Sequence, residues 1–261
     1  MRTSDERFLK LATAAAKEAG RIQVIRYGQR HEIKYKGEID PVTEVDKLCE
    51  QAIVEMISRT FPDHDILSEE TSFEGKGSPW KWIIDPIDGT TNYIHEYPCF
   101  CVSIGLELEG KVVLGAVYDP TRDELFSAAR GAGAFLNRRR IHVSGQTKLS
   151  SALLATGFPY DIAESKINNL DNFARMYKKA QAIRRGGSAA LDICYLACGR
   201  FDGFWELKLH PWDAAAGLVI VEEAGGRVTT IDGQKYSIYE KSLLASNRKI
   251  HRQMQKVLLN I

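Results

Sequence analysis

The chain has 261 residues, of which 44% are hydrophobic and 26% charged, a balance typical of a globular protein with a full core. Its 35 lysines and arginines nearly cancel its 34 aspartates and glutamates, which excludes a global field that would draw it onto nucleic acid or an acidic membrane. It shows no apolar run of membrane-spanning length and no signal peptide, and its five cysteines lack zinc-type spacing, so we expect reduced thiols and a cytoplasmic location.

The first half predicts two helices followed by an antiparallel meander. Apolar side chains recur at helical spacing over residues 5–27 and 44–61, and a short extended piece at 31–36 lies between them. Strands are predicted from apolar runs and alternation at 65–67, 80–84, 100–108, 112–118 and 125–129. The basic run at 138–140 is interpreted as a solvated hairpin turn in preference to a nucleic-acid patch.

The second half alternates helices and strands. Helices are predicted at 163–180, 188–198 and 213–224, and strands at 153–155, 202–207 and 227–230. No linker of low complexity divides the chain, so residues 1–261 are predicted to form one α/β domain. Its approximate halves, 1–145 and 146–261, are expected to pack as layers with a cleft between them.

Two aspartates follow the apolar run at 80–84. Residues 82–92 read Trp-Ile-Ile-Asp-Pro-Ile-Asp-Gly-Thr-Thr-Asn, which places Asp85, Asp88 and the carbonyl of Ile87 at the tip of a strand. Gly89 frees the backbone, and Thr90 can start a helix whose N–H groups are unpaired. Such oxygen ligands suit Mg²⁺, and free N–H groups suit a phosphate. The alternative is a structural turn, because Asp-Pro and Asp-Gly are common turn pairs.

Three further acidic segments end near strands or helices. Glu69 follows a short strand, Asp46 lies in the first turn of the helix predicted at 44–61, and Asp213 stands at the predicted N-cap of the helix at 213–224. Taken singly, Asp213 could be an ordinary helix cap and Asp46 a solvated helix residue. Acids gathered in one cleft repel each other unless cations neutralise them, so together these segments favour a multi-metal site.

These segments resemble the signatures of the inositol monophosphatase family. The first signature extends from Trp82 to Tyr93. The second begins with Trp-Asp-Ala-Ala-Ala-Gly at 212–217 and continues to the glycine pair at 225–226, and the acidic segments at 40–46 and 69–70 occur in the same order. The resemblance covers nearly the whole chain. It implies an α-β-α-β-α sugar-phosphatase sandwich with mixed, largely antiparallel sheets, and two to three Mg²⁺ ions.

The resemblance also implies roles for individual residues. The metal ligands would be Glu69, Asp85, the Ile87 carbonyl, Asp88 and Asp213. Thr90, hydrogen-bonded to Asp46, would orient and help deprotonate the attacking water. The substrate would be bound by Gly89, Thr90, Arg184, Ser188, Ala189 and Glu206. Arg184, Arg185 and Lys36 could equally be surface charges.

By this resemblance the chain is expected to be a Mg²⁺-dependent phosphatase of a small phosphate monoester, with inositol 1-phosphate as the first choice of substrate. Lithium sensitivity and a homodimer are expected on the same ground, and membrane or nucleic-acid partners are not. One alternative is fructose-1,6-bisphosphatase or another sugar or polyol phosphatase. An alternative of a different class is a binding protein on this scaffold with an RNA- or transcription-associated role.

Overall fold

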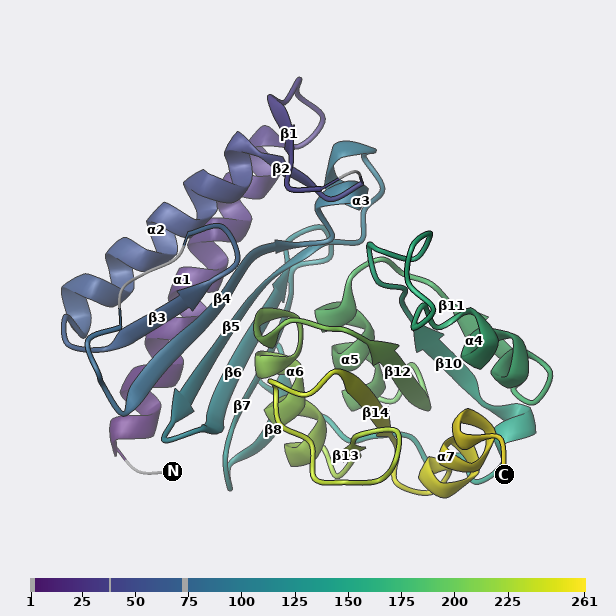
Figure 1. The fold of residues 1–261 in the computed structure, drawn as a ribbon. Coiled ribbons are helices and arrows are strands. Elements are labelled where there is room, and N and C mark those ends of the chain that lie inside the picture. The colour runs from purple at the N-terminus through teal and green to yellow at the C-terminus, as the bar shows by residue number, and fades with distance from the viewer. Residues whose placement is uncertain (1–2, 38, 72–74) are drawn as a thin grey trace.

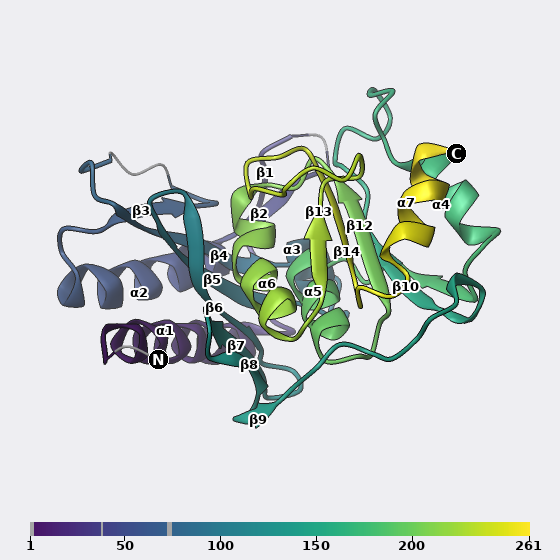
Figure 2. The ribbon, with the colours of Figure 1, turned by 90° about the horizontal axis from the view of Figure 1, so that it is seen from below.

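The computed structural model describes residues 3–37, 39–71 and 75–261 as layers of helices and sheets. A helix pair, a seven-stranded sheet, a second helix pair, a five-stranded sheet and a third helix pair follow one another across the molecule (Figure 1). The view from below shows the same succession edge-on (Figure 2). The order of layers confirms the predicted α-β-α-β-α sandwich. None of the described helices combines the length and the apolar character needed to cross a bilayer.

The first layer consists of α1 (Thr3–Arg26) and α2 (Glu44–Thr60), which pack on the seven-stranded sheet. A hairpin of β1 (Ile33–Tyr35) and β2 (Pro41–Thr43) precedes α2. Helix α1 buries alanines at positions 12, 15, 16 and 19, and these small side chains let it lie close to its neighbours. Helix α2 begins in a capping box, in which the Thr43 side chain accepts from the N–H of Val45 and the Asp46 carboxylate accepts from the N–H of Thr43.

The seven-stranded sheet has the order β3-β4-β5-β6-β7-β8-β9, with β3 parallel to β4 and the other pairs antiparallel. Its strands are β3 (Asp65–Ser68), β4 (Trp80–Asp88), β5 (Cys101–Leu108), β6 (Lys111–Asp119), β7 (Glu124–Ala129), β8 (Gly133–Leu136) and β9 (Arg139–Arg140). The register of β4 against β5 shifts between Asp85 and Asp88. Pro86 lies in this interval and has no N–H to give the ladder, so the strand bulges where the two aspartates lie. The short helix α3 (Thr90–Ile94) follows.

The five-stranded sheet has the order β11-β10-β12-β14-β13. Its strands are β10 (Leu153–Thr156), β11 (Ala182–Arg184), β12 (Gly203–Leu207), β13 (Arg227–Thr229) and β14 (Ser242–Ser246). A 3₁₀ turn (Leu149–Ser151) leads into this sheet, and helices α4 (Leu170–Tyr177) and α7 (His251–Leu259) lie on its outer side (Figure 2).

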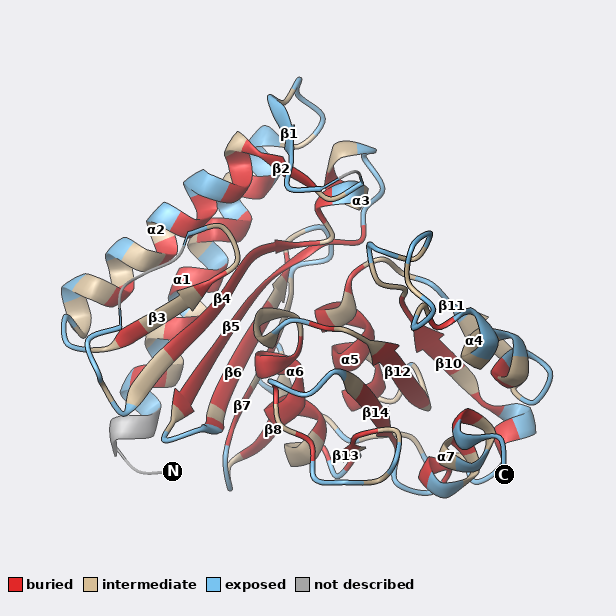
Figure 3. Cartoon of the chain, in the orientation of Figure 1, coloured by how far each residue is buried: buried red, intermediate tan, exposed pale blue. Residues whose placement is uncertain are grey.

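Helices α5 (Ala189–Ala197) and α6 (Pro211–Glu223) fill the space between the two sheets and are largely buried (Figure 3). Helix α6 approaches the first sheet closely because the sheet offers glycines to it. A Cβ added to Gly115 would lie 2.5 Å from the carbonyl oxygen of Ala216, and one added to Gly105 would lie 2.8 Å from the Cβ of Ala215. This close packing brings the start of α6 to the β4 bulge.

Most elements predicted from the sequence are present, with three differences. The helix predicted at 163–180 is wrong over 163–169, because α4 begins only at Leu170 and a loop precedes it. Asp213 is the third residue of α6, whose N-cap is His210, so the predicted cap position is wrong by three residues. Strands β2, β8, β9, β11 and β14 and helix α7 were not predicted, although β14 and α7 belong to the second half of the core.

Candidate active site

The β4 bulge presents Asp85 and Asp88 on a constrained turn. The N–H of Ile87 donates to Asp85 Oδ1 at 3.0 Å, which orients that carboxylate. Gly89 follows with φ +100, a conformation that glycine adopts readily. A Cβ at this position would lie 2.9 Å from the carbonyl oxygen of Cys99, so the turn excludes any larger residue. Both aspartates are buried.

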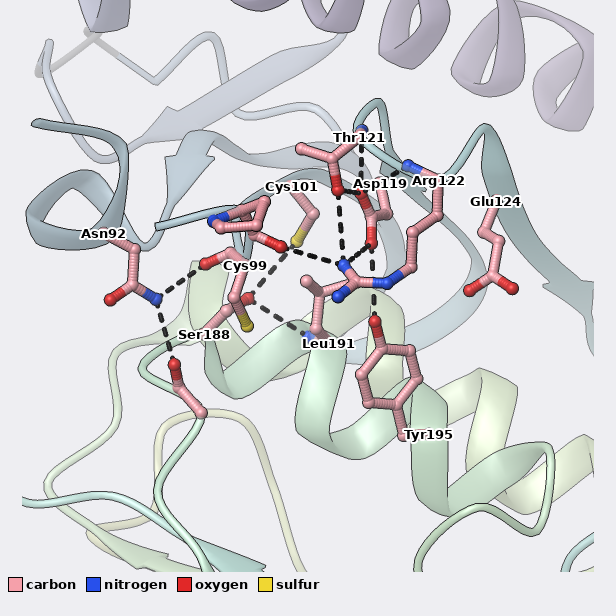
Figure 4. Close-up of polar contacts among 12 residues, drawn as sticks. Asn92, Cys99, Cys101, Asp119, Thr121, Arg122, Glu124, Ser188, Leu191 and Tyr195 are labelled. Atoms are coloured by element: carbon pink, nitrogen blue, oxygen red, sulfur yellow. Dashed lines mark hydrogen bonds and ion pairs between the residues drawn. The ribbon is translucent and has the colours of Figure 1, made fainter. Parts of the chain in front are cut away.

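Asp88 is held in place by the second half of the chain. Its Oδ2 accepts from the Ser188 hydroxyl at 2.6 Å and from the N–H of Ala190 at 2.7 Å. The Cys101 thiol approaches the same oxygen at 3.9 Å. Ser188 also caps α5 through the N–H of Leu191, a contact visible in Figure 4. The sequence assigned Ser188 to the substrate, and the structure gives its hydroxyl to this carboxylate.

Asn92 connects the two halves beside the aspartates. Its Nδ2 donates to the carbonyl of Cys99 at 2.7 Å and to that of Gly186 at 2.9 Å (Figure 4). The contact fixes α3 against the loop that leads into α5, and so it keeps Ser188 near Asp88. From the sequence, Asn92 is expected only to help start a helix. Its position in the first signature hints at a role, but the spacing of residues does not show that it bonds to Gly186, 94 residues away.

Asp213 reaches the same place from the start of α6. Its Oδ2 accepts from the N–H of His210 at 2.7 Å, and the rings of His210 and Trp212 stack with centroids 4.8 Å apart. The Ser103 hydroxyl on β5 donates to the Trp212 carbonyl at 3.2 Å, which ties the helix start to the sheet. One carboxylate oxygen from each of Asp85, Asp88 and Asp213 lies within 4.8 Å of the others. The structure thus brings together three of the predicted ligands.

Glu69 directly follows β3, and it lines the same cavity as Asp85. Lys36 Nζ donates to Glu69 Oε1 at 2.9 Å and to Glu70 Oε1 at 2.6 Å. Burial opposes the charged ammonium, yet the two glutamates raise the pKa of Lys36 above its ordinary value. Lys36 is therefore a cation of the acidic cluster and not a free surface charge.

Burial and mutual repulsion perturb the carboxylates strongly. Burial first, and then the charges of neighbouring acids, raise the pKa values of Asp85 and Asp213 well above the ordinary range. Burial raises the pKa of Asp88 too, although its hydrogen bonds oppose the shift. The pKa of Glu69 rises to about 7, chiefly through burial. A cluster of carboxylate oxygens destabilised in this way fits a hard divalent cation, which would relieve the repulsion.

Asp46 and Thr90 form a hydrogen-bonded pair at the edge of the cluster. Thr90 Oγ1 lies 3.0 Å from Asp46 Oδ1 and 3.0 Å from the carbonyl oxygen of Ile87, while Asp46 Oδ2 accepts from the Thr43 hydroxyl at 2.6 Å. Burial raises the pKa of Asp46 to about 6, against the effect of its hydrogen bonds. The solvated-helix alternative for Asp46 is wrong, because its side chain is fully buried.

A cavity of about 250 Å³ opens over the cluster. Its lining includes four acids of the cluster and four neighbouring residues: Glu69, Asp85, Asp88, Asp213, Gly89, Thr90, Tyr160 and His210. A neighbouring cavity of about 620 Å³ shares Tyr160 and His210 and adds Glu206. Arg184, Ser188 and Ala189 are not among the described residues that line either cavity, and Arg184 is exposed.

Glu206 is buried on β12, with its carboxylate packed on Gly157, where a Cβ would lie 2.1 Å from Oε1. Burial, reinforced by the charges of Asp192 and Asp88, raises the pKa of Glu206 to about 8. This shift favours the protonated form of the carboxyl in the metal-free protein, and that form offers both a donor and an acceptor to the larger cavity.

Phosphoric monoester hydrolase is the class of enzyme that this layered fold and acidic cavity define. A model of the inositol monophosphatase family matches residues 4–260, and the chain belongs to that metal-dependent family. An inositol-1-monophosphatase of Synechocystis sp. is 46% identical over 253 residues, covering 96% of this chain and 88% of the relative. A Nus factor SuhB of Pseudomonas aeruginosa is 43% identical over 251 residues, covering 92% of each.

Solved structures agree with this assignment. The inositol monophosphatase from Anabaena (Nostoc) sp. PCC 7120 superposes with a TM-score of 0.92 at 43% identity, covering 99% of this chain and 98% of that one. An IMPase/NADP phosphatase complexed with Mg²⁺ and phosphate superposes with a TM-score of 0.85 at 28% identity, covering 98% and 96%. The fold expected from the resemblance is thus confirmed over the chain's length.

Proposed function

We propose that this phosphatase hydrolyses a small phosphate monoester with a polyol leaving group, inositol 1-phosphate being the first choice, with two to three Mg²⁺ ions. The observation that carries the proposal is the approach of three carboxylates, the buried Asp85 and Asp88 and the partly buried Asp213, to within 4.8 Å of one another. Glu69 and the Ile87 carbonyl line the same cavity and complete the proposed ligand set. Bound Mg²⁺ would neutralise these acids and the charge of the phosphate, and would act as a Lewis acid towards it.

The pair of Asp46 and Thr90 is proposed to handle the proton of the attacking water. The Thr90 hydroxyl can donate to Asp46 while a lone pair of its oxygen accepts from a water in the cavity. A carboxyl whose pKa is about 6 is mostly ionised at neutral pH and still basic enough to accept a proton. The backbone N–H groups of Gly89 and Thr90, next to the acids, are proposed to bind phosphate oxygens.

Glu206 and the 620 Å³ cavity are proposed to receive the leaving alcohol. The cavity adjoins the acidic cluster through Asp213, and it combines a buried carboxyl with the rings of Phe158 and Tyr160. A polyol offers hydroxyl groups to Glu206 and carbon faces to the rings, so its shape and polarity fit this wall. We propose a less direct role in substrate binding for Ser188, Ala189 and Arg184, which line neither cavity. Ser188 would act by positioning Asp88.

A substrate panel in Mg²⁺ tests the proposal. We expect turnover of inositol 1-phosphate to exceed that of fructose 1,6-bisphosphate, histidinol phosphate and nucleoside 3′-phosphates. Asp88→Asn should abolish turnover and keep the fold, because it removes a proposed ligand and retains the shape of the side chain. Asp65→Asn is a matched control, since Asp65 is a buried acid that accepts from the N–H of Lys76 and does not line the cavity.

Two results would contradict parts of the proposal. Fast hydrolysis of fructose 1,6-bisphosphate without turnover of inositol phosphates would refute inositol 1-phosphate as the substrate, but it would not contradict the proposed metal site. Near-full turnover by Asp88→Asn would overturn the metal site itself. On the family resemblance we also propose a homodimer, inhibition by Li⁺ and a cytoplasmic location; light scattering, inhibition assays and cell fractionation test these three points.

A binding role is a second candidate, because relatives more than 40% identical are named Nus factor SuhB. The feature of this chain that fits such a role is the exposed arginine run at 138–140, on and beside strand β9. Retention on RNA that weakens with salt, and that is lost when these arginines are replaced by glutamine, would support it. Retention unchanged by the replacement would exclude this surface.

A further inference from the structure

The segment between β10 and α4, residues 157–169, forms a loop whose two ends are held together. Asn169 closes the base: its Nδ2 donates to the Gly157 carbonyl at 2.7 Å and to Thr156 Oγ1 at 3.0 Å, and its Oδ1 accepts from Trp205 Nε1 at 2.9 Å. Asn169 itself has φ +72, a left-handed conformation that asparagine tolerates. A compact surface loop with joined ends is a frequent carrier of function.

Lys208 ties the middle of this loop to the end of β12. Its Nζ donates to Asp161 Oδ2 at 2.6 Å and to Ser165 Oγ at 2.7 Å. The backbone of Lys208 has φ +61, a conformation that favours glycine and strains a lysine. Its N–H donates to the Lys241 carbonyl at 2.7 Å, which holds the strained position. A lysine thus occupies a backbone position that suits glycine better, and the hydrogen bonds of its side chain are made to the loop.

The loop forms the outer wall of the proposed alcohol site. Phe158, Tyr160 and Ile167 line the 620 Å³ cavity together with Glu206 and Lys208. Tyr160 also lines the cavity over the acids, and it is half-exposed between the two. Displacing the loop would therefore widen the alcohol side of the site without moving the carboxylates on β4 and α6.

We propose that Lys208 is a positioning residue that latches the 157–169 loop through Asp161 and Ser165, so that Tyr160 confines the site to compact polyol leaving groups. The proposal rests on the proposed function and adds to it the element that selects the alcohol. Since Lys208 acts through the loop, its loss should change the binding of the alcohol portion and spare the binding of phosphate.

Lys208→Gly tests the latch, because glycine suits φ +61 and removes only the side chain. We expect an unchanged or higher Tm, an unchanged inhibition constant for inorganic phosphate, and a kcat close to that of the wild type. KM for inositol 1-phosphate should rise about tenfold, the equivalent of one hydrogen bond to a charged group. In Lys208→Arg the guanidinium can still reach Asp161, so this variant should keep a KM for inositol 1-phosphate close to that of the wild type.

A double-mutant cycle identifies the partner. Asp161→Ala removes the other end of the latch and leaves the strained backbone untouched, so it should raise KM by a similar factor. The variant carrying both changes should be no worse than either single change, because the two residues act as one unit. Fully additive losses, or a KM that Lys208→Gly leaves unchanged, would overturn the proposal.

Hydrogen exchange on the metal-free protein gives a readout independent of turnover. Amides of residues 158–168 should exchange faster in Lys208→Gly than in the wild type, while those of β4 and α6 stay the same. Equal exchange in the loop would refute the latch. If the wild type hydrolyses no phosphate monoester, the proposed function fails, and the exchange experiment still decides whether Lys208 holds the loop.

Discussion

Replacing Asp213 by asparagine should stabilise the metal-free protein and remove most of its response to Mg²⁺. Asp213, itself partly buried, lies within 4.8 Å of the buried carboxylates of Asp85 and Asp88, and each ionised pair at that separation repels by about 3 kcal/mol at an effective dielectric constant near 20. Protonation already relieves part of this repulsion, so we expect a net gain of about 2 kcal/mol. The lost helix-dipole term is smaller, about 0.3–1 kcal/mol, and the asparagine oxygen can still accept from the N–H of His210.

Thermal unfolding with and without Mg²⁺ measures both effects. A gain of about 2 kcal/mol corresponds to a rise of roughly 4–8 °C in the Tm of a protein of this size. Mg²⁺ at about 100 times its Kd should stabilise the wild type by about 2.7 kcal/mol and Asp213→Asn by much less. Asp65→Asn, remote from the cavity, should keep the full Mg²⁺ response. A variant at Asp213 that is less stable without Mg²⁺ and responds fully to it would refute the reasoning.

Other predictions concern the proton relay, the alcohol wall and the dependence on pH. Thr90→Ala should lower kcat by about 10²-fold and Thr90→Ser much less, because the hydroxyl links Asp46 to the water; steady-state kinetics checks this, and equal losses would exclude the relay. Gly157→Ala should raise KM for inositol 1-phosphate, since its Cβ would displace the Glu206 carboxyl; an unchanged KM would remove Glu206 from the alcohol site. The metal-free protein should lose stability as pH rises from about 4.5 to 8, because Glu69 and Glu206 have folded pKa values of about 7 and about 8, above their ordinary value, and so bind more protons when folded. Thermal scans in a chelator test this trend, which Mg²⁺ should flatten, and a Tm that rises over this range would contradict it.

The core of the site could be predicted from the sequence because its chemistry is local. Asp85 and Asp88 stand on one turn, and proline and glycine determine the shape of that turn from short-range sterics alone. Asp213 is placed by a strong helix start, so its predicted element was right and only its cap position was wrong. The close approach of α6 to the sheet depends on Gly105 and Gly115. The sequence does not show that these glycines make room for Ala215 and Ala216 of α6.

The parts that could not be predicted depend on partners far along the chain. The helix predicted from residue 163 fails because Asn169 and Ser165 are engaged by Trp205 and Lys208, and these contacts outweigh a modest helical preference. Likewise, the hydroxyl of Ser188 belongs to Asp88, 100 residues away, and no periodicity indicates that pairing. Spacing reveals what a segment can form by itself, whereas these hydrogen bonds arise only when the two halves meet.

The most direct measurement of the metal site is an anomalous-scattering experiment on crystals soaked in Mn²⁺, a substitute for Mg²⁺ in sites built from oxygen ligands. We predict anomalous peaks in direct contact with Asp85, Asp88 and Asp213, and their loss in crystals of Asp88→Asn. Peaks confined to other surfaces of the wild-type protein, with these three carboxylates left free of metal, would contradict the account.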